Sequence, residues 1–567
     1  MLRRLTKALT VCALPWLAAA RLAALEPIKT VEIGNRGEIR VNGAPFFPLM
    51  LWLQVPRHFP ILQQIGANTL MGYTFDRGSG RGMGGTRNIV EYGQRSWQAG
   101  FYFVPSYSQG IPADDLKSLL ASPNLLGWIQ QDEPDLSMTV SDAEVVPARH
   151  MRVNPKTPFF RILDGATSSW TVLEPMAGAE FTIRLKSPVT VHSLAVWQTI
   201  SPRLAVAKEV VFLGDGKEIL KAELANQRGQ QKFALPQPAT FKELTLKVVS
   251  EHAGIADNQG WGSISEVEGF DKEGNNVLAS PPRNVPRGSA EELMGVYRAI
   301  QEIDPRRPVF MTFTAGFMSR KTKYEEAVRE KIYPEFVKAC DIVGFDIYPI
   351  FGYGTPGDLH AVAEGTTELR KLAGPARPVY VWIETNKGSR WMTASKQPDV
   401  KPEHTRAEVW MAIIRGAKGI AYFTHKWVDP DGTQNYTQFA PDAAMQKELR
   451  RLNAQVTRWA PAILAAPATS RVRMTLRGGL PCHAMATQLD GALYVFAQNI
   501  DLGENAAKLR QFDPISPRGG QGTIEVEGLA AGTRVEVLDE DRTVVAQEGK
   551  FLDEFGPLAE HIYRIRR

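Results

Sequence analysis

The stretch DIVGFDIY at Asp341–Tyr348, with HAVAEGTTELRKL at His360–Leu372 and PVYVWIET at Pro378–Thr385, decides the fold class of this chain. The two outer segments are short apolar runs rich in β-branched and aromatic residues, which is typical of buried strands. The segment between them has the length and the apolar spacing of a helix. A strand, a helix and a strand in this order predict a parallel βαβ unit.

The same alternation extends to both sides of this unit. Strands are expected at Phe46–Leu53, Asn68–Thr74, Phe101–Tyr107, Leu125–Gln131, Pro308–Thr314, Asp341–Tyr348, Pro378–Thr385 and Gly419–Phe423. Helices are expected at Arg57–Ile65, Arg87–Ala99, Asp114–Leu120, Ala290–Glu302, Tyr324–Ala339, His360–Leu372, Thr405–Ala417 and Gln446–Trp459. Such a series predicts an α/β fold, the closed (β/α)8 or TIM barrel. An open doubly wound sheet is the alternative, and the lack of a Gly-rich turn after the first strand disfavours it.

Two regions lack the alternation of strands and helices. In residues 159–280, segments such as Phe181–Leu185 and Phe241–Val249 alternate apolar with polar residues between turns, as in an antiparallel β-sandwich. We therefore expect a β-sandwich inserted after strand 4 of the barrel, with the barrel itself formed by residues 25–158 and 281–465. Residues 466–567 again have an all-β pattern and predict a C-terminal β-sandwich domain.

The N-terminus has the features of an export signal. The basic start MLRRLTK is followed by an apolar run that ends in small residues at Ala18–Ala20. This pattern predicts a signal peptide over residues 1–24 and a secreted or periplasmic protein, with a short amphipathic helix as the alternative. No later stretch is apolar over the ~20 residues of a membrane helix, so membrane insertion is not expected.

Charge and cysteine content exclude several functions. The net charge of +5 is spread over 567 residues without a basic stripe, which argues against a nucleic-acid partner. After cleavage of the signal only Cys340 and Cys482 remain, in segments assigned to different domains, so a disulfide framework is not expected. No His/Cys cluster has the spacing of zinc ligands, and we expect neither a metal nor another cofactor. The oligomeric state is left open.

Two glutamates terminate apolar strands of the expected barrel. Glu133 follows Gln130–Asp132 at the end of the fourth strand, and Glu384 follows Val379–Ile383 at the end of the seventh. Reactive groups of such barrels project from the carboxyl ends of strands. Two carboxylates there suit glycoside cleavage, since one protonates the leaving oxygen and the other attacks the anomeric carbon or activates water. For each glutamate alone, a salt bridge with a rim arginine is the alternative.

On these residues the barrel resembles a clan A glycoside hydrolase over roughly residues 45–461, apart from the insertion. The resemblance implies a retaining mechanism with Glu133 as acid/base and Glu384 as nucleophile. It also implies that Tyr348 contacts the nucleophile and that Trp427 forms the floor of the sugar subsite. The clan usually has Asn before the acid/base, where it binds the sugar 2-hydroxyl. Here Asp132 stands in that place, which leaves the 2-substituent of the substrate open.

Other residues near strand ends are weaker candidates for substrate binding. The aromatic ones are Trp52, Tyr73, Tyr107 and Trp391, for which core packing is the alternative. His425 and Asp346 are candidates for contacts with sugar hydroxyls, with a structural role as the alternative. The Gly-rich run Gly78–Gly85 lacks the Lys-Ser/Thr of a P-loop and is interpreted as a rim loop.

The inserted region resembles a coagulation-factor type C (discoidin) module. The matching pieces are Asp164–Trp170, Phe181–Val191 and Trp261–Val267. Such modules frequently bind sugars through loops at one end, and many are only structural.

Together these features predict a secreted glycoside hydrolase that cleaves β-linked substrates with retention. A non-catalytic carbohydrate-binding protein built on a degenerate barrel and a transglycosidase are the alternatives. The expected partner is an oligosaccharide, polysaccharide or other glycoside, and neither the sugar nor exo or endo action is determined by the sequence.

Overall fold

The computed structural model describes residues 25–75, 88–140, 143–154, 156–201, 204–252, 260–279 and 283–566. The expected signal peptide and the rim loop Gly78–Gly85 lie outside these ranges. The chain divides into two compact units. The first consists of residues up to 130, residues 299–310 and residues 341 onward, and the second of residues 131–298 and 311–340. The division passes through two barrel strands, and each unit is described by itself.

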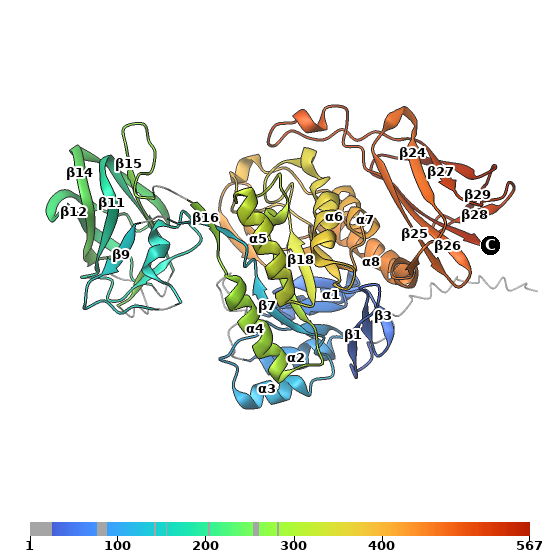
Figure 1. Cartoon of the computed structure of the whole chain (residues 1–567), viewed down its shortest axis with the longest axis horizontal. Helices are drawn as coiled ribbons and strands as arrows, with labels where there is room; N and C mark the ends of the chain where they lie inside the picture. Colours follow the sequence, from blue (N-terminus) through green and yellow to red (C-terminus); the bar gives the residue numbers. More distant parts are fainter. Residues whose placement is uncertain are drawn as a thin grey trace, which may run out of the picture. The chain divides into compact units, whose positions relative to one another are not determined.

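Eight strands form one sheet, and its order is that of a barrel. They are β4 (Leu49–Trp52), β5 (Thr69–Met71), β6 (Tyr102–Val104), β7 (Trp128–Asp132), β17 (Val309–Phe313), β18 (Ile342–Asp346), β19 (Val379–Glu384) and β20 (Gly419–Phe423). Their order is β6-β5-β4-β20-β19-β18-β17-β7, and two of them, β7 and β18, are labelled in Figure 1. Isolated parallel bridges join Phe103 to Leu125 and Ser106 to Ile129, which brings β6 next to β7 and nearly closes the ring. The predicted eight-stranded parallel barrel is thus confirmed.

Each expected helix has a counterpart in the described chain. These are α1 (Phe59–Gln64), α2 (Ile89–Gln98), α3 (Ala113–Leu120), α4 (Ala290–Ile303), α5 (Glu326–Phe336), α6 (Ala361–Ala373), α7 (Pro402–Ile414) and α8 (Ala443–Ile463). The last two begin earlier than expected. Pro402 opens α7, where its missing N–H costs nothing, and the Asp442 carboxylate caps α8 by accepting from the Met445 amide at 2.8 Å. None of the described helices has both the length and the apolar character that a membrane-spanning helix requires.

Aromatic side chains fill the interior of the barrel in the first unit. The ring of Tyr380 lies 6.0 Å from that of Phe310 and 6.2 Å from that of Trp382. Trp52 meets Trp382 edge-on at 5.4 Å. A Cβ at Gly344 would lie 2.3 Å from the Tyr380 ring, so β18 requires glycine at that point. The interior is therefore a packed core, as is usual for this fold.

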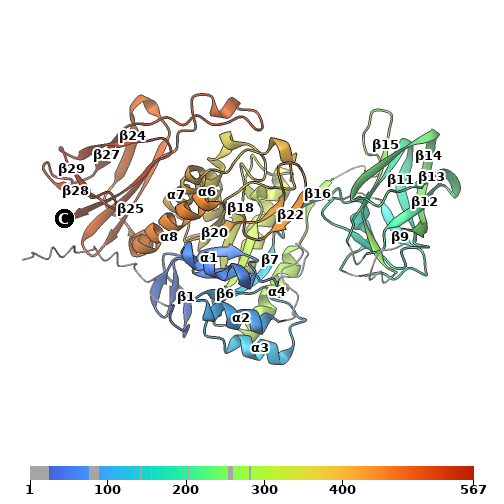
Figure 2. The ribbon, with the colours of Figure 1, turned by 180° about the vertical axis from the view of Figure 1, so that it is seen from behind.

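Two antiparallel sheets form the C-terminal part of the first unit (Figure 2). The larger has the order β23-β25-β26-β31-β28-β29 and the smaller the order β24-β27-β30. Their bounds are β23 (Ala466–Pro467), β24 (Val472–Leu476), β25 (Cys482–Leu489), β26 (Ala492–Asn499), β27 (Gly520–Val526), β28 (Arg534–Val537), β29 (Arg542–Val545), β30 (Lys550–Phe555) and β31 (Glu560–Arg566). They share one apolar core, which includes Val495, Ile524, Val535, Phe551 and Tyr563.

The larger C-terminal sheet also packs on the barrel helices. Gln498 donates to the Ala407 carbonyl of α7 at 3.0 Å, and Thr487 donates to the Ala462 carbonyl of α8 at 2.7 Å. Trp410 stacks on Phe496 at 6.0 Å. This interface stabilises the outer helices of the barrel.

The second unit contains an antiparallel sheet of seven strands. In chain order these are β9 (Glu144–Pro147), β10 (Thr171–Leu173), β11 (Glu180–Gln198), β12 (Ala207–Gly214), β13 (Lys217–Glu223), β14 (Gly229–Glu251) and β15 (Gly262–Phe270). The long strands β11 and β14 pair with breaks in register between Arg184 and Val189 and between Val191 and Ser193, where β-bulges bend a sheet. The sheet has its own core, which includes Phe181, Leu194, Phe212, Leu246 and Ile264. A separate pair, β8 (Ser137–Val140) and β16 (Arg283–Pro286), brings the two ends of this region together.

Candidate functional site

Five aromatic side chains gather at the carboxyl ends of β18, β19 and β20. This aromatic platform consists of Tyr348, Phe351, Trp391, Phe423 and Trp427. Tyr348 lies 4.9 Å from Phe423, ring centre to ring centre, and Phe423 stacks on Trp427 at 5.7 Å. Trp391 lies 5.5 Å from Trp427 and is 51% exposed. The predicted candidates Tyr348, Trp391 and Trp427 are thus brought together around a partly exposed tryptophan.

A short hairpin borders the platform. It consists of β21 (Lys426–Val428) and β22 (Gln434–Thr437). The guanidinium carbon of Arg390 lies 4.9 Å from the centre of the Trp427 ring, within the range of a cation–π contact. Arg390 and Trp391 are exposed and Trp427 is half-buried, so this surface combines a cation with indole rings. Ligand sites commonly combine a few polar groups with an aromatic floor in this way.

His425 is buried beneath the hairpin. Its Nε2 lies 2.9 Å from the carbonyl of Trp52, so this nitrogen carries the proton and donates. Its Nδ1 lies 3.1 Å from the Tyr436 hydroxyl, which donates to it. Burial lowers the pKa of His425 to about 4, so the ring is neutral. Because both nitrogens have partners within the protein, direct binding of a sugar by His425 stays a prediction.

Glu384 lies at the end of β19 with 0% of its surface exposed. Its Oε1 accepts from the Ile350 amide at 2.9 Å, and its Oε2 accepts from the Phe351 amide at 2.6 Å. Its carboxyl is also hydrogen-bonded to Glu408 of α7. Burial raises the pKa of Glu384 to about 7, against the opposing effect of these hydrogen bonds. Glu384 therefore anchors the turn after β18, and its role as nucleophile stays a prediction.

Glu408 is a residue that the sequence patterns did not single out. Both of its carboxyl oxygens are buried, and apart from Glu384 no partner for them is found among the described residues. Burial raises its pKa well above the usual value, and the adjacent Glu384 raises it further. The pair is compatible with its surroundings when it shares a proton. The available signal was a glutamate inside the otherwise apolar run from Ala407 to Ile414.

Most other predicted aromatics lie in or near the core. Trp52 is 8% exposed against Trp382 inside the barrel, and Tyr73 is buried among Tyr92 and Phe103. Tyr107 is half-buried and meets Trp128 edge-on at 6.3 Å. Asp346 ends β18 and is half-buried.

In the second unit, Glu133 follows β7 in a fixed and unusual backbone conformation. Its φ is +48°, a left-handed conformation that few non-glycine residues adopt and that is found at functional sites. Its amide donates to the Thr312 carbonyl at 2.9 Å. Arg287 donates to the carbonyls of Asp132 and Glu133, so one guanidinium holds two successive peptide groups. The side chain of Glu133 is half-buried.

Two further carboxyls flank Glu133. The pKa of Asp132 is raised to about 7 by removal of its carboxyl from water and by Glu133, although the residue as a whole is only half-buried. Asp135 is buried and accepts from the Thr314 amide at 2.9 Å, the Thr314 hydroxyl at 2.8 Å and the Tyr333 hydroxyl at 2.7 Å. Burial raises the pKa of Asp135 to about 7. Asp135 and Arg287 were missed from the sequence, although Asp135 lies in the same DEPD stretch.

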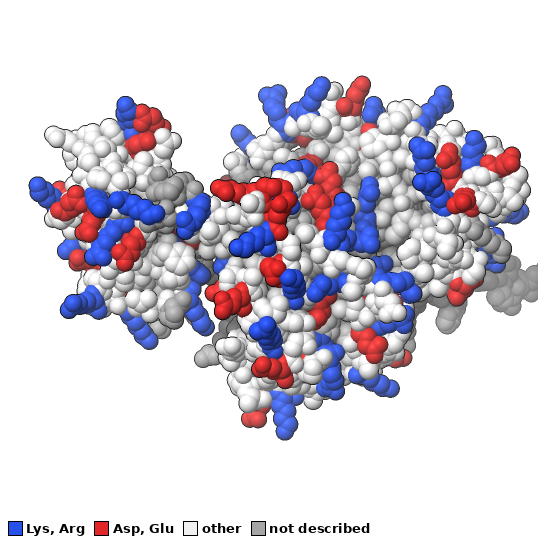
Figure 3. All heavy atoms as spheres, viewed as in Figure 1, with Lys and Arg blue, Asp and Glu red and all other residues white. Residues whose placement is uncertain are grey.

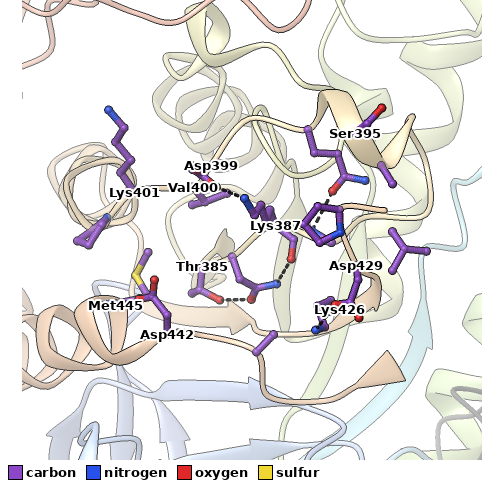
Figure 4. Close-up of a pocket in the computed structure, with 18 residues that line it drawn as sticks. Thr385, Lys387, Ser395, Asp399, Val400, Lys401, Lys426, Asp429, Asp442 and Met445 are labelled. Atoms are coloured by element: carbon purple, nitrogen blue, oxygen red, sulfur yellow. Dashed lines mark hydrogen bonds and ion pairs between the residues drawn. The ribbon is translucent and has the colours of Figure 1, made fainter. Parts of the chain in front are cut away.

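A cavity of about 520 Å³ lies between the β19–α7 and β20–α8 connections (Figure 4). Two ion pairs border it, Lys387–Asp399 at 2.6 Å and Lys426–Asp429 at 2.8 Å. Thr385, Ser395, Asp442 and Met445 also line it, and its lining includes no aromatic ring. Lys387, Lys401 and Lys426 line it together with Asp399, Asp429 and Asp442, so its positive and negative charges balance and it offers a polar surface without net attraction for an anion.

The described residues give no sign of a metal centre. Within the described ranges, no three His, Cys, Asp or Glu side chains lie together as metal ligands would. Cys340 and Cys482 are free thiols.

In the inserted region, Asp164 accepts from the Ala166 amide at 2.8 Å, and Glu266 is buried beside it with its pKa raised to about 10 by burial and by Asp164. On the face shown in Figure 3, acidic and basic side chains are interspersed.

Comparisons with known proteins give likenesses of parts of the chain only. No family model matches, and no curated protein matches. Among solved structures, a family 32 carbohydrate-binding module from C. perfringens NanJ in complex with galactose is 10% identical and covers 24% of this chain and 98% of its own, with a TM-score of 0.20. An α-amylase from Geobacillus thermoleovorans in complex with acarbose is 12% identical over 50% of this chain and 58% of its own, with a TM-score of 0.33. An α-amylase from Anoxybacillus is 10% identical over 49% and 57%, with a TM-score of 0.32. At these identities and TM-scores the likenesses identify neither a family nor an activity.

Proposed function

We propose that this chain is a glycoside hydrolase that is exported from the cytoplasm and cleaves β-linked glycosides with retention. The observation that carries the proposal is the aromatic platform with its half-exposed Trp391 at the carboxyl ends of three barrel strands. Indole faces offer a sugar ring a flat apolar surface, and neighbouring polar groups bind its hydroxyls. The carboxyl ends of barrel strands are where enzymes of this fold carry their catalytic groups.

In the proposed mechanism Glu133 protonates the glycosidic oxygen while Glu384 attacks the anomeric carbon. The C–O bond to the leaving group breaks, and an ester between the sugar and Glu384 forms. Glu133, now ionised, takes a proton from water, whose oxygen attacks the same carbon and releases Glu384. In this mechanism Asp132 binds the 2-hydroxyl, or the substituent in its place, of the sugar whose bond is cleaved. With a pKa of about 7, it is able to donate or accept near neutrality.

The burial of Glu384 sets a condition on this mechanism. Its carboxyl accepts the amides of Ile350 and Phe351, so a sugar reaches it only after these two residues of the turn that follows β18 have shifted. Hydrogen bonds at catalytic groups commonly rearrange on formation of the substrate complex. The proposal therefore includes a movement of this turn when substrate binds.

The second candidate is a carbohydrate-binding protein without catalysis. The observation that favours it is the same burial of Glu384, since a carboxyl fixed between two amides and Glu408 serves a structural role. The platform and the inserted sheet would then each be a place for a glycan. A transglycosidase would use the same residues with a sugar as acceptor, and its longer products distinguish it from a hydrolase.

The test combines hydrolysis and binding. A panel of aryl β-glycosides is offered to the full mature chain, to Glu133→Gln, to Glu384→Gln and to Glu403→Gln, a control on α7. The proposal expects turnover of at least one glycoside by the wild type and the control. Glu384→Gln should lose turnover of every glycoside, and Glu133→Gln should lose it on the glycosides with poor leaving groups. Turnover by none of the four, together with retarded migration in gels that contain polysaccharide, would establish the binding protein instead.

A further inference from the structure

The turn that carries two of the five rings of the aromatic platform is bonded to the C-terminal domain. Residues 348–354 contain Tyr348 and Phe351 and close on themselves, with the Gly352 amide donating to the Tyr348 carbonyl at 2.8 Å and the Gly354 amide donating to the Ile350 carbonyl at 2.9 Å. The same turn supplies the two amides that bind Glu384. Its geometry therefore fixes both platform rings and the proposed nucleophile.

A segment between β26 and β27 bonds directly to this turn. The Phe512 amide donates to the Gly354 carbonyl at 2.6 Å. The side-chain amide of Gln511 donates to the Tyr353 carbonyl at 2.8 Å. These contacts join residues more than 150 positions apart in sequence, as the separation of 158 between Gln511 and Tyr353 shows.

The contact of Phe512 is also steric. A Cβ at Gly354 would lie 2.6 Å from the Phe512 ring and 3.3 Å from the Met392 sulfur, so the glycine lies between these two side chains. Met392 follows Trp391, the exposed ring of the platform. Phe512 thus contacts the turn after β18 at the point where the loop after β19 meets it.

The backbone of Phe512 is held in a conformation that its residue type disfavours. Its φ is +75°, in the left-handed region, where a bulky residue without glycine's freedom is an outlier. Such conformations persist where surrounding contacts enforce them, and they cluster at ligand sites. The Phe512 amide and the Gln511 side chain both bond to the turn at this point, at Gly354 and Tyr353.

We infer that Gln511 and Phe512 of the C-terminal domain complete the saccharide site and that Phe512 is a positioning residue, which sets the platform by clamping the turn at residues 348–354. The inference rests on the proposed function for the saccharide and on the structure alone for the clamp. It gives the C-terminal domain a part in substrate binding beyond its support of α7 and α8. Substrates that extend across Trp391 and the exposed Tyr353 are the ones that would depend on it most.

The test uses the full chain with Phe512→Ala and, as a control at an exposed position of the same domain, Val545→Ala. Amide hydrogen exchange of the peptide over residues 345–358 reports on the turn whatever the protein binds. We expect this peptide to exchange faster in Phe512→Ala than in the wild type, and at the wild-type rate in Val545→Ala. The melting temperature of Phe512→Ala should be unchanged. Unchanged exchange would overturn the clamp. A second variant, Phe512→Gly, keeps the left-handed backbone without strain and should behave like Phe512→Ala if the ring is what matters.

Binding of the glycan that the wild type recognises gives the second readout. We expect about tenfold weaker binding or a higher KM with kcat changed much less, because small misplacements of binding groups are costly. Equal affinity of Phe512→Ala and wild type, despite faster exchange, would overturn the role in the saccharide site. Absence of any glycan binding in the wild type would instead overturn the proposed function, and the exchange result would still decide the clamp.

Discussion

Glu408 on α7 lies against Glu384 at the end of β19, and neither carboxyl is exposed. Because both carboxyls are removed from water, the pair retains a proton at a pH at which each carboxyl alone in water would be ionised. The folded protein therefore holds more protons than the unfolded chain at neutral pH, and the stability of the first unit depends on pH through this pair.

Stability should fall as the pH rises towards neutrality. The pKa of Glu384 is raised from 4.5 to about 7 on folding, so its contribution is complete below pH 4.5 and is lost as the pH rises through 7. One pKa unit corresponds to 1.36 kcal/mol, so the loss is at most about 3 kcal/mol. Urea unfolding at pH 5 and pH 8 measures it. In Glu408→Gln the amide is able to donate to an ionised Glu384, and the difference between the two pH values should shrink. Parallel pH curves for this variant, the wild type and the control Glu403→Gln would contradict the shared proton.

Glu133→Gln should separate substrates by their leaving groups. Loss of a general acid costs about 10²- to 10⁴-fold in kcat on glycosides with poor leaving groups. Substrates with strongly acidic phenols need no protonation and should lose much less. The measurement is kcat against leaving-group pKa for the variant and the wild type. Equal slopes in the two plots would mean that Glu133 is not the acid.

Trp391→Ala should weaken glycan binding without loss of stability. The side chain is 51% exposed, so its removal leaves no buried void. Aromatic contacts of this kind contribute about 0.5–1.5 kcal/mol beyond area burial, which corresponds to roughly two- to tenfold in the dissociation constant. Isothermal titration with the bound glycan and a thermal melt give both quantities. Val545→Ala, at an exposed apolar position of the C-terminal domain, is the control, and an equal loss in both would argue against a specific role of Trp391.

Asp135→Ala should destabilise the second unit. It removes the acceptor of the Thr314 amide, the Thr314 hydroxyl and the Tyr333 hydroxyl, all buried or half-buried. Stranded donors of this kind cost about 1–3 kcal/mol each, less whatever relaxation recovers. Thermal unfolding compared with Glu144→Ala, an exposed change in the same unit, measures the effect. A melting temperature equal to that of the control would show that these hydrogen bonds contribute little.

The barrel was predictable because its strands are apolar runs with turns at both ends, and periodicity reports such runs directly. The starts of α7 and α8 were predicted too far along the chain. The signals for these starts are Pro402 and Asp442, which lie before the apolar pattern of each helix begins. Tyr348 and Trp427 were assigned to the sugar site by the resemblance to clan A, and Trp391 was a candidate by its place near a strand end.

The environment of Glu384 was not predictable from the same patterns. The end of a strand determines the position of the backbone of Glu384, but not the surroundings of its carboxyl. The carboxyl is buried by the turn at residues 348–354 and by Glu408 on α7. The surroundings of Trp52 were likewise not predictable from its position, since its ring packs against Trp382, and its place in a subsite stays a prediction. The clamp at Phe512 was not predictable either. It joins segments far apart in the sequence, with 158 positions between Gln511 and Tyr353, and a local pattern gives no information on such a contact.

The most direct test of the central claim is to trap the covalent intermediate. The mature protein is incubated with a 2-deoxy-2-fluoro β-glycoside of the sugar it hydrolyses and digested for mass spectrometry. A retaining mechanism through Glu384 predicts an added mass of one fluorosugar on the peptide that contains Glu384, and none in Glu384→Gln. An adduct on a different carboxylate, or turnover with no adduct and with inversion at the anomeric carbon, would contradict the account.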